Sequence, residues 1–251
     1  MRFLATVTAL TGTLVAALPS PLEEIRSREL VESHRQTMET LEARGWKSGA
    51  GATANELLDG GPCPKVIFIY ARGSTEGGNL VSFSSPLCQG SLGSPTGVAL
   101  DAAYGEANVW VQGVGGAYDA GLLDNLLPEG TTTGAINEMK SLLVRANSLC
   151  PQAKIVAGGY SQGAALAGAA ISQSSAAIRE QIKGVVLYGW TKNQQNNGKI
   201  PNYPANRLKV YCESGDLVCN GSLIVLPAHG TYADEAADEA PKFLISRINA
   251  S

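Results

Sequence analysis

The hexapeptide Gly-Gly-Tyr-Ser-Gln-Gly at residues 158–163 constrains the fold of this chain more than any other feature. It follows an apolar run at residues 154–157, typical of a strand, and leads into the small apolar residues of a predicted helix over 162–174. A strand, a sharp turn that carries a serine, and a helix form a nucleophile elbow. The turn raises Ser161 over the carboxyl edge of a sheet, where the helix dipole favours negative charge. The motif predicts a serine esterase, which also needs an acid and a histidine.

The rest of the chain alternates strands with helices. Apolar runs predict buried parallel strands over residues 65–71, 108–113, 154–157, 184–189 and 207–212. Helical spacing predicts helices over residues 133–149, 162–174, 177–182 and the second half of 232–248. Such alternation favours a parallel sheet covered by helices on both faces. We therefore expect an α/β fold, a small α/β-hydrolase with a central sheet of about five strands.

The chain has two histidines, and their order along the sequence separates them. Enzymes with this elbow carry the serine, the acid and the histidine in that order. His34 lies upstream of Ser161, whereas His229 lies downstream, in a loop before the last predicted helix. A lone loop histidine is often only a solvated residue, but the order and the position favour His229 as the catalytic base.

Three carboxylates lie between Ser161 and His229. Glu180 lies in a predicted helix and is typical of a solvated helix charge. Glu213 and Asp216 lie just past the end of a strand, where parallel sheets place their chemistry. Asp216 follows a glycine at the apex of this loop, so we favour it over Glu213 as the acid that orients the histidine. The alternative is an aspartate that only shapes the turn.

The oxyanion of an acyl-transfer reaction needs at least two hydrogen-bond donors. One should be the backbone N–H of Gln162, the residue after the nucleophile, and the other should come from the loop after the first strand. That loop spans residues 71–77, where Gly73 allows close backbone approach and Ser74 offers both N–H and O–H. The alternative interpretation of this loop is a simple turn.

The N-terminal residues differ from the rest of the chain. A basic start and an apolar stretch of small residues predict a signal peptide over residues 1–17, and hence a secreted, extracellular protein. Residues 18–44 are charge-dense and precede a Gly/Ala-rich tract, which favours a propeptide over an ordinary surface helix. Residues 45–251 form one predicted catalytic domain, with an ordered core at about 60–249. The apolar stretches are too short to span a membrane.

Five cysteines in a secreted chain suggest two disulfides and one odd thiol. Cys212 and Cys219 bracket a short loop that a disulfide can close. Cys63 precedes the first strand and Cys150 precedes the elbow strand, so both lie near the same edge of a parallel sheet. Cys88 lies in a Ser/Gly/Pro-rich stretch with no evident partner.

Charge and spacing argue against other classes of protein. The formal net charge of −3 comes without a basic patch, so nucleic-acid binding has no support. None of the cysteines stands at metal-ligand spacing beside a histidine, so we expect no metal site. We expect a monomer.

Several segments together resemble fungal cutinases, and the resemblance runs from about Cys63 to Ile248. It rests mainly on residues 63–76, 111–118, 158–165 and 215–219. The resemblance implies an extracellular hydrolase of cutin, the hydroxy-fatty-acid polyester of plant cuticle, that needs no cofactor. It also implies that the insoluble polyester or a long-chain ester is the binding partner.

The resemblance assigns roles to individual residues. It implies a triad of Ser161, Asp216 and His229, and an oxyanion hole formed by Ser74 and Gln162. Asn125 matches the asparagine that hydrogen-bonds the oxyanion serine in this family. The two disulfides of the family correspond to Cys63–Cys150 and Cys212–Cys219.

The chain also departs from the family pattern. The segment between residues 79 and 110 is longer than in near relatives and contains Cys88, whose expected partner is missing. Gly230 follows the histidine where a larger apolar residue is common. Asn220 begins an Asn-Gly-Ser sequon at the rim of the predicted site and is a glycosylation candidate.

Two apolar clusters flank the predicted site in the sequence, and either is also compatible with ordinary core. As a substrate crevice we expect Leu122, Leu123, Leu126, Val225 and Leu226. The nearest rival function is that of an acetylxylan esterase, which shares the fold but would favour polar and aromatic rims. A rival from another class is a non-catalytic surface-binding protein on the same scaffold.

Overall fold

The computed structural model describes residues 53–80 and 92–251 of the chain. The predicted signal peptide and propeptide, His34 and Cys88 lie outside the described residues. A short helix, α2 (Glu56–Asp59), precedes the expected start of the ordered core at about residue 60. Leu57 of α2 is fully buried, so the packed structure begins before residue 60.

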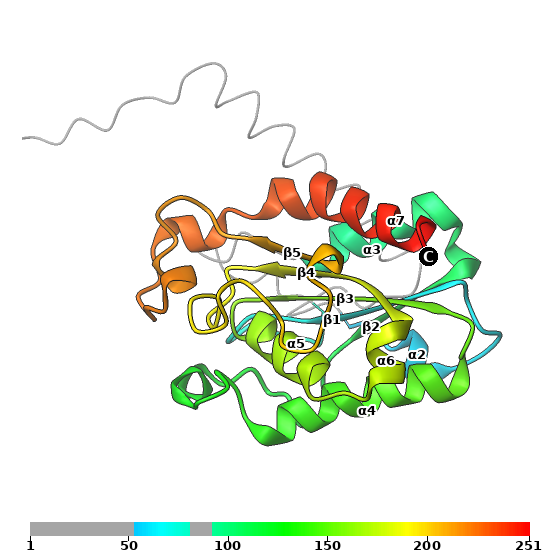
Figure 1. Cartoon of the computed structure of the whole chain (residues 1–251), viewed down its shortest axis with the longest axis horizontal. Coiled ribbons are helices and arrows are strands. Elements are labelled where there is room, and N and C mark those ends of the chain that lie inside the picture. The colour runs from blue at the N-terminus through cyan, green and yellow to red at the C-terminus, as the bar shows by residue number, and fades with distance from the viewer. Residues whose placement is uncertain (1–52, 81–91) are drawn as a thin grey trace, which may run out of the picture. The chain divides into compact units, whose positions relative to one another are not determined.

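Five parallel strands form the central sheet in the order β2-β1-β3-β4-β5 (Figure 1), which confirms the expected fold class. Their bounds are β1 (Val66–Ala71), β2 (Val109–Gly113), β3 (Lys154–Tyr160), β4 (Ile182–Tyr188) and β5 (Leu208–Tyr211). After β1 the chain adds β2 on one side and then returns to add the later strands on the other. A sheet whose strand order reverses in this way forms a crevice at the carboxyl ends of its strands. Here that point lies between β1 and β3.

Helices cover both faces of the sheet (Figure 1). One face carries α2, α4 (Thr133–Leu149), α5 (Gln162–Ser172) and α6 (Ala176–Gln181). The other carries α3 (Gly93–Tyr104) and α7 (Ala240–Asn249). Within the described ranges, none of these helices has the length and apolar character needed to cross a bilayer.

The alternating side chains of the central strand β1 supply two separate cores. Ile67 and Ile69 are fully buried in the cluster that includes residues of α4 and α5. Phe68 and Tyr70 point the other way, into the cluster that includes residues of α3 and α7. Each such burial contributes roughly 1.5–3 kcal/mol. Because both faces are anchored, the carboxyl edge of the sheet is a firm base for the loops above it.

Short helices connect the main elements. They are η1 (Glu106–Asn108), η2 (Leu122–Leu126), η3 (Ala205–Arg207), η4 (Leu217–Asn220), η5 (Pro227–Gly230) and the π-helix η6 (Glu235–Glu239). The helix α3 is not indicated by the sequence pattern, because its Gly-Ser-Pro-Thr start and small residues are typical of a loop. Packing of α3 against α7 and η6 outweighs this weak local preference.

Both expected disulfide pairings are present. Cys63–Cys150 joins the segments that enter β1 and β3, at the amino edge of the sheet. Cys212–Cys219 closes the loop after β5, at the carboxyl edge. The first link therefore closes a long loop between the entries to two strands, with a sequence separation of 87, whereas the second closes the short loop that carries Asp216.

Candidate active site

Ser161 stands in a strained turn between β3 and α5. Its φ is 54°, a left-handed conformation that costs energy for any residue other than glycine. The turn is compact because two glycines leave no space for side chains: a Cβ on Gly159 would lie 2.3 Å from the carbonyl oxygen of Gly163, and one on Gly163 would lie 2.1 Å from that of Ala71. The serine is thus presented at the start of a helix, as the hexapeptide predicts.

His229 lies in η5, and its side chain contacts Ser161 at the carboxyl edge of the sheet. Its Nε2 lies 2.9 Å from Oγ of Ser161, and its side chain is almost fully buried. Tyr160 supports the same segment, because its hydroxyl donates a hydrogen bond of 2.8 Å to the backbone oxygen of His229. The rings of Tyr160 and His229 also pack with centroids 5.0 Å apart.

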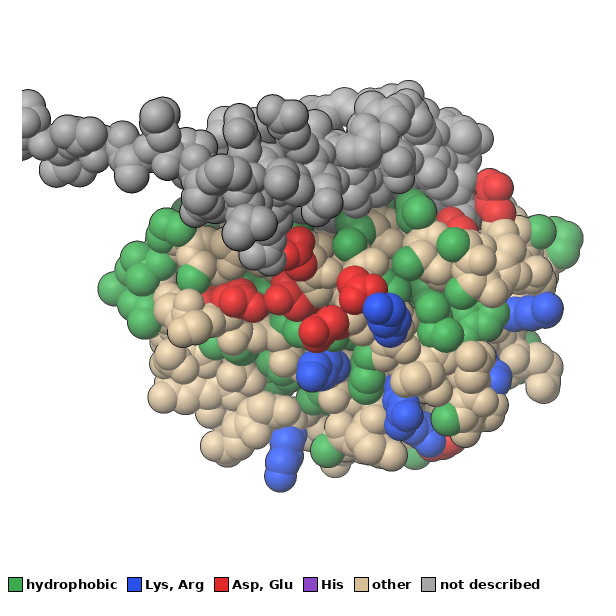
Figure 2. All heavy atoms as spheres, turned by 90° about the horizontal axis from the view of Figure 1, so that it is seen from above, with side chains coloured by type: hydrophobic (Ala, Val, Ile, Leu, Met, Phe, Trp, Pro, Cys, Tyr) green, Lys and Arg blue, Asp and Glu red, His purple; other side chains and the backbone are tan. Residues whose placement is uncertain are grey.

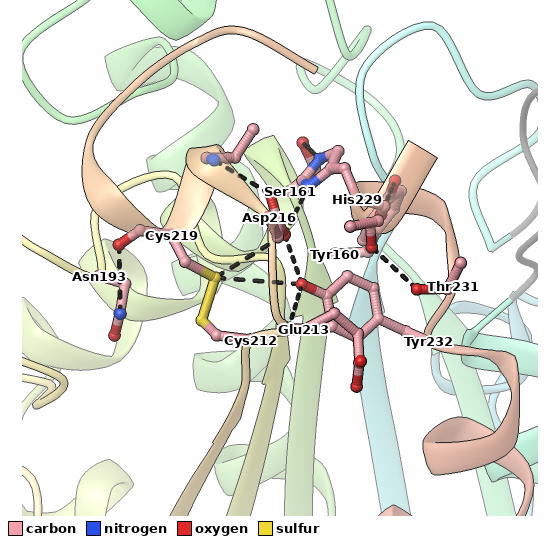
Figure 3. A network of polar contacts seen from close by, with 12 residues as sticks. Tyr160, Ser161, Asn193, Cys212, Glu213, Asp216, Cys219, His229, Thr231 and Tyr232 are labelled. Atoms are coloured by element: carbon pink, nitrogen blue, oxygen red, sulfur yellow. Dashed lines mark hydrogen bonds and ion pairs between the residues drawn. A yellow bond between two sulfur atoms is a disulfide. The ribbon is translucent and has the colours of Figure 1, made fainter. Parts of the chain in front are cut away.

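Asp216 completes a continuous line of hydrogen bonds (Figure 3). Its Oδ2 lies 2.9 Å from Nδ1 of His229, and its Oδ1 accepts the backbone N–H of Val218 at 3.0 Å. The hydroxyl of Tyr232 donates a short hydrogen bond to Oδ2 as well. Burial disfavours the charged carboxylate, but the hydrogen bonds from His229 and Tyr232 outweigh it, so the pKa of Asp216 lies below its usual value.

The two competing carboxylates do not join this line. Glu213 is in the same disulfide loop, but it is the backbone N–H of Glu213 that faces the cluster, donating to the Tyr232 hydroxyl at 3.1 Å. Glu180 accepts two hydrogen bonds from Arg207, at 3.0 and 3.1 Å, on an exposed surface. The geometry therefore brings Asp216, and neither glutamate, to His229.

The loop after β1 faces Ser161 from the other flank. Oγ of Ser74 accepts a hydrogen bond of 2.8 Å from Nδ2 of Asn125, which also donates to the backbone oxygen of Leu122 at 2.9 Å. With its oxygen held by Asn125, the Ser74 hydroxyl can direct its proton into the cleft. The side chain of Gln162 donates to the backbone oxygen of Gly121 at 2.6 Å, while its backbone N–H belongs to the unpaired first turn of α5.

Two buried charged residues of this loop, Arg72 and Glu76, were missed by sequence reasoning. The guanidinium of Arg72 donates to the backbone oxygens of Glu76 and Val114, at 2.6 and 3.1 Å. The Glu76 carboxylate accepts the backbone N–H of Gly73 at 2.7 Å. Burial raises the pKa of Glu76 to about 7, although the bond from Gly73 and the charge of Arg72 lower it. The sequence Arg-Gly-Ser-Thr-Glu gives no sign that this glutamate is buried.

An open cleft of about 660 Å³ lies above Ser161 and is lined by Ser74, Asn125 and His229 as well. All five residues expected in the crevice line it: Leu122, Leu123, Leu126, Val225 and Leu226. They are 40% to 76% exposed, so they are rim residues and not ordinary core. Figure 2 shows hydrophobic side chains gathered at the left of the molecule. In Figure 1 the segment between β5 and α7 lies at the same end. An exposed apolar group of this kind is typical of a binding surface.

Asn220 is exposed at the end of η4, followed by Gly221 in a left-handed conformation, and it does not line the cleft. Across the described ranges, no group of three or more His, Cys, Asp or Glu side chains is arranged to hold a metal ion. Tyr160 and Tyr232 were missed at the sequence level, where only their nearness to Ser161 and His229 could have pointed to them.

Comparison with known proteins identifies the family of the chain. A family model described as Cutinase matches residues 62–248, which confirms the resemblance expected from the sequence. The curated protein Cutinase 2 of Fusarium vanettenii is 47% identical over 254 aligned residues, covering 100% of this chain and 98% of that protein.

Two solved structures share the architecture. A Trichoderma reesei cutinase in complex with a phosphonate inhibitor has a TM-score of 0.65 and 27% identity, covering 91% of this chain and 92% of that one. An acetylxylan esterase has a TM-score of 0.54 and 21% identity, covering 74% of this chain and 99% of that one, a likeness of fold alone. On the family model and the full-length identity to curated relatives, the chain belongs to the cutinase family of carboxylic ester hydrolases.

Proposed function

We propose that the protein is a secreted serine esterase that hydrolyses the ester bonds of cutin through Ser161, His229 and Asp216. One observation carries the proposal: the unbroken line from Oγ of Ser161 to Nε2 of His229, and from Nδ1 of His229 to Oδ2 of Asp216, with both contacts at 2.9 Å. This is the arrangement that lets an imidazole accept the proton of a serine while a buried carboxylate holds the correct tautomer.

The reaction proceeds in two halves. Oγ of Ser161 attacks the ester carbonyl carbon while its proton passes to Nε2 of His229, giving a tetrahedral oxyanion. The oxyanion collapses, the bond to the alcohol breaks, and His229 returns the proton to the leaving alcohol. Water then attacks the acyl-enzyme, again losing its proton to His229, and the carboxylic acid leaves as Ser161 is restored.

The oxyanion is stabilised by two donors on different elements. They are the backbone N–H of Gln162, at the start of α5, and the hydroxyl of Ser74, with its backbone N–H beside it. Asn125 holds the Ser74 oxygen at 2.8 Å, so the hydroxyl proton stays aimed at the cleft and little reorganisation is needed in the transition state.

The substrate class is inferred from the rim. Leu123, in η2, and Val225, before η5, both line the open cleft and are 76% and 66% exposed, which suits a long aliphatic acyl chain presented by a solid polyester. A sugar-binding site would place polar or aromatic groups there, which argues against an acetylxylan esterase. The name of the Fusarium relative, Cutinase 2, supports the same choice.

A labelling experiment tests the mechanism. The protein is treated with a serine-directed phosphonate and the modified peptide is mapped by mass spectrometry, with Ser161→Ala as the control. We expect one label, on Ser161, and loss of all esterase activity in the variant. Labelling of another residue would refute the proposed nucleophile, and full biological effect without Ser161 would favour a non-catalytic binding protein.

A substrate comparison tests the specificity. Initial rates on cutin, p-nitrophenyl butyrate, a long-chain p-nitrophenyl ester and acetylated xylan are measured for the wild type and for Leu123→Ser and Leu226→Ser. We expect cutin to be hydrolysed and acetylated xylan to be poor, with the serine variants weakened most on long chains. Equal losses on long and short esters would remove the rim from the substrate site.

The processing of the chain belongs to the same proposal. We propose that residues 1–17 are a signal peptide, that 18–44 are a propeptide, and that 45–251 are the monomeric catalytic domain. The two disulfides fit an oxidising, extracellular environment. Intact mass and N-terminal sequencing of the secreted protein test the cleavage sites, and light scattering tests the monomer. Release of a glycan by an endoglycosidase, abolished in Asn220→Gln, tests the sequon.

A further inference from the structure

Tyr232 lies three residues after His229, and its hydroxyl is bound inside the polar network of the site (Figure 3). The side chain is fully buried. The hydroxyl donates to Oδ2 of Asp216 and accepts the backbone N–H of Glu213 at 3.1 Å. Because the N–H of Glu213 occupies a lone pair of the phenol oxygen, the phenol proton is directed at the carboxylate.

Oδ2 of Asp216 therefore serves two donors at once. It accepts from the Tyr232 hydroxyl and lies 2.9 Å from Nδ1 of His229, while Oδ1 accepts the backbone N–H of Val218. A donor on the shared oxygen withdraws negative charge from the side that faces the imidazole. It also resists rotation of the carboxylate, which would otherwise break the contact with His229.

Packing alone does not account for this hydroxyl. The Tyr232 ring fills core space beside Tyr188 and Tyr160, with ring centroids 6.1 and 6.2 Å away. Phenylalanine would make those ring contacts equally well. A buried carboxylate, in contrast, requires donors, and a charge-assisted hydrogen bond is among the stronger ones.

We propose that Tyr232 is a positioning residue of the esterase reaction: its hydroxyl holds Asp216 in register with His229 and limits how strongly the imidazole retains a proton. This inference rests on the proposed triad. The titratable groups that face the hydroxyl are Asp216 and Glu213, with His229 beyond Asp216 and Glu235 beyond Glu213. A change confined to the hydroxyl leaves all four in place.

The principal test is Tyr232→Phe, assayed with p-nitrophenyl butyrate across pH 4 to 10. We expect kcat/KM to fall about 10- to 100-fold, the usual effect of losing one hydrogen bond to a charged group. We also expect the acidic limb of the kcat/KM profile to move to higher pH, because the unshielded carboxylate leaves the imidazole more basic. Rates are expressed per active site titrated with a phosphonate, so unfolded molecules are not counted.

The matched control is Tyr203→Phe. Tyr203 is also a buried tyrosine, and its hydroxyl donates to the backbone oxygen of Ile182 at 3.0 Å, at the start of β4 and away from the cleft. Its loss should lower the unfolding temperature without moving the pH profile. If Tyr232→Phe changes rate and profile no more than Tyr203→Phe does, the inference is wrong.

A second substitution acts in the opposite direction and keeps the fold. Tyr232→3-fluorotyrosine retains ring and hydroxyl but makes the phenol a stronger donor, so the acidic limb should move to lower pH. An unchanged limb in this variant would overturn the inference even if Tyr232→Phe did not fold. A double-mutant cycle of Tyr232→Phe with Asp216→Asn distinguishes failure of the proposed triad from failure of the proposed role of Tyr232. Full activity in Asp216→Asn alone would reject the triad. Additive losses in the double variant would reject only the role of Tyr232.

Discussion

Two buried carboxylates lie near Ser161, and their environments shift their pKa values in opposite directions. Asp216, on the histidine side, is 1% exposed, and its pKa is lowered. Glu76, within the oxyanion loop, is 6% exposed, and burial raises its pKa to about 7. Solvent exposure is low for both side chains, so exposure alone does not distinguish the charged carboxylate from the one whose pKa is raised.

The hydrogen-bond donors that reach each carboxylate differ, and this difference favours the charged form of Asp216. Asp216 accepts from the imidazole of His229, the hydroxyl of Tyr232 and the backbone of Val218. Glu76 accepts the backbone N–H of Gly73 at one oxygen, and among the described residues nothing donates to the other, Oε1. Arg72 is close, but its donors go to backbone oxygens. The donors to Asp216 hold the pKa of that carboxyl below its usual value, whereas burial raises the pKa of Glu76 to about 7.

The largest effect we expect is at the histidine side. Asp216→Asn should lower kcat by about 10⁴-fold, since an amide leaves the imidazole in the wrong tautomer. Glu213→Gln, in the same disulfide loop, is the matched control and should keep most of the activity. Steady-state kinetics on p-nitrophenyl butyrate decide between them, and a larger loss in Glu213→Gln would transfer the acid role to that residue.

On the oxyanion side, we expect Glu76 to make the free energy of unfolding depend on pH. The pKa of Glu76 is raised in the folded state from 4.5 to about 7, so the folded protein holds this proton more tightly than the unfolded chain. Its contribution to stability is therefore complete below pH 4.5 and declines as the pH rises through 7. Relative to Glu76→Gln, the wild type should lose about 3 kcal/mol of unfolding free energy between pH 4 and pH 8.

Urea unfolding of both proteins at several pH values gives that difference directly. Glu129→Gln removes an exposed carboxylate and controls for the change in net charge. A difference between wild type and Glu76→Gln that stays constant with pH would mean that Glu76 does not titrate in this range.

The disulfide of the histidine side should matter for activity more than for stability. Replacing Cys212 and Cys219 by Ala opens a loop with a sequence separation of 7, which should cost about 2.5 kcal/mol and lower kcat about tenfold as Asp216 loosens. Replacing Cys63 and Cys150 should cost more stability, about 4.5 kcal/mol, yet leave the kcat of folded protein unchanged. Thermal unfolding and active-site-titrated rates measure both; equal effects on kcat would contradict the distinction.

The smallest effect on kcat is expected from the orientation of the Ser74 hydroxyl. Asn125→Ala frees Oγ of Ser74, so kcat should fall about tenfold, near 1.4 kcal/mol, with little change in KM. Asn147→Ala is the control, because it removes an amide that donates to Gln181 at 2.6 Å, far from the cleft. A rise in KM at constant kcat would indicate a role in ground-state binding instead.

Sequence patterns were sufficient where local rules are strong. The elbow motif and the apolar runs predict the five strands. The order of serine, acid and histidine selects Ser161, Asp216 and His229, three side chains that hydrogen-bond in the structure. They fail where tertiary contacts decide: α3 has a loop-like start at Gly93, and the hydroxyl of Tyr232 meets a carboxylate sixteen positions earlier. Arg72 likewise donates to the backbone oxygens of Val114 and Tyr118, more than 40 positions along the chain, which no local pattern can reveal.

The contact of Gly163 with the carbonyl oxygens of Ala71 and Arg72 has a consequence for how this site can diverge. Main chain of the elbow helix packs closely on main chain at the root of the oxyanion loop, which leaves no space for a side chain at position 163. We expect a substitution that shifts the helix to shift the oxyanion loop as well. We therefore expect natural and laboratory variation to accumulate in the leucines of the rim, while the floor beneath them stays invariant.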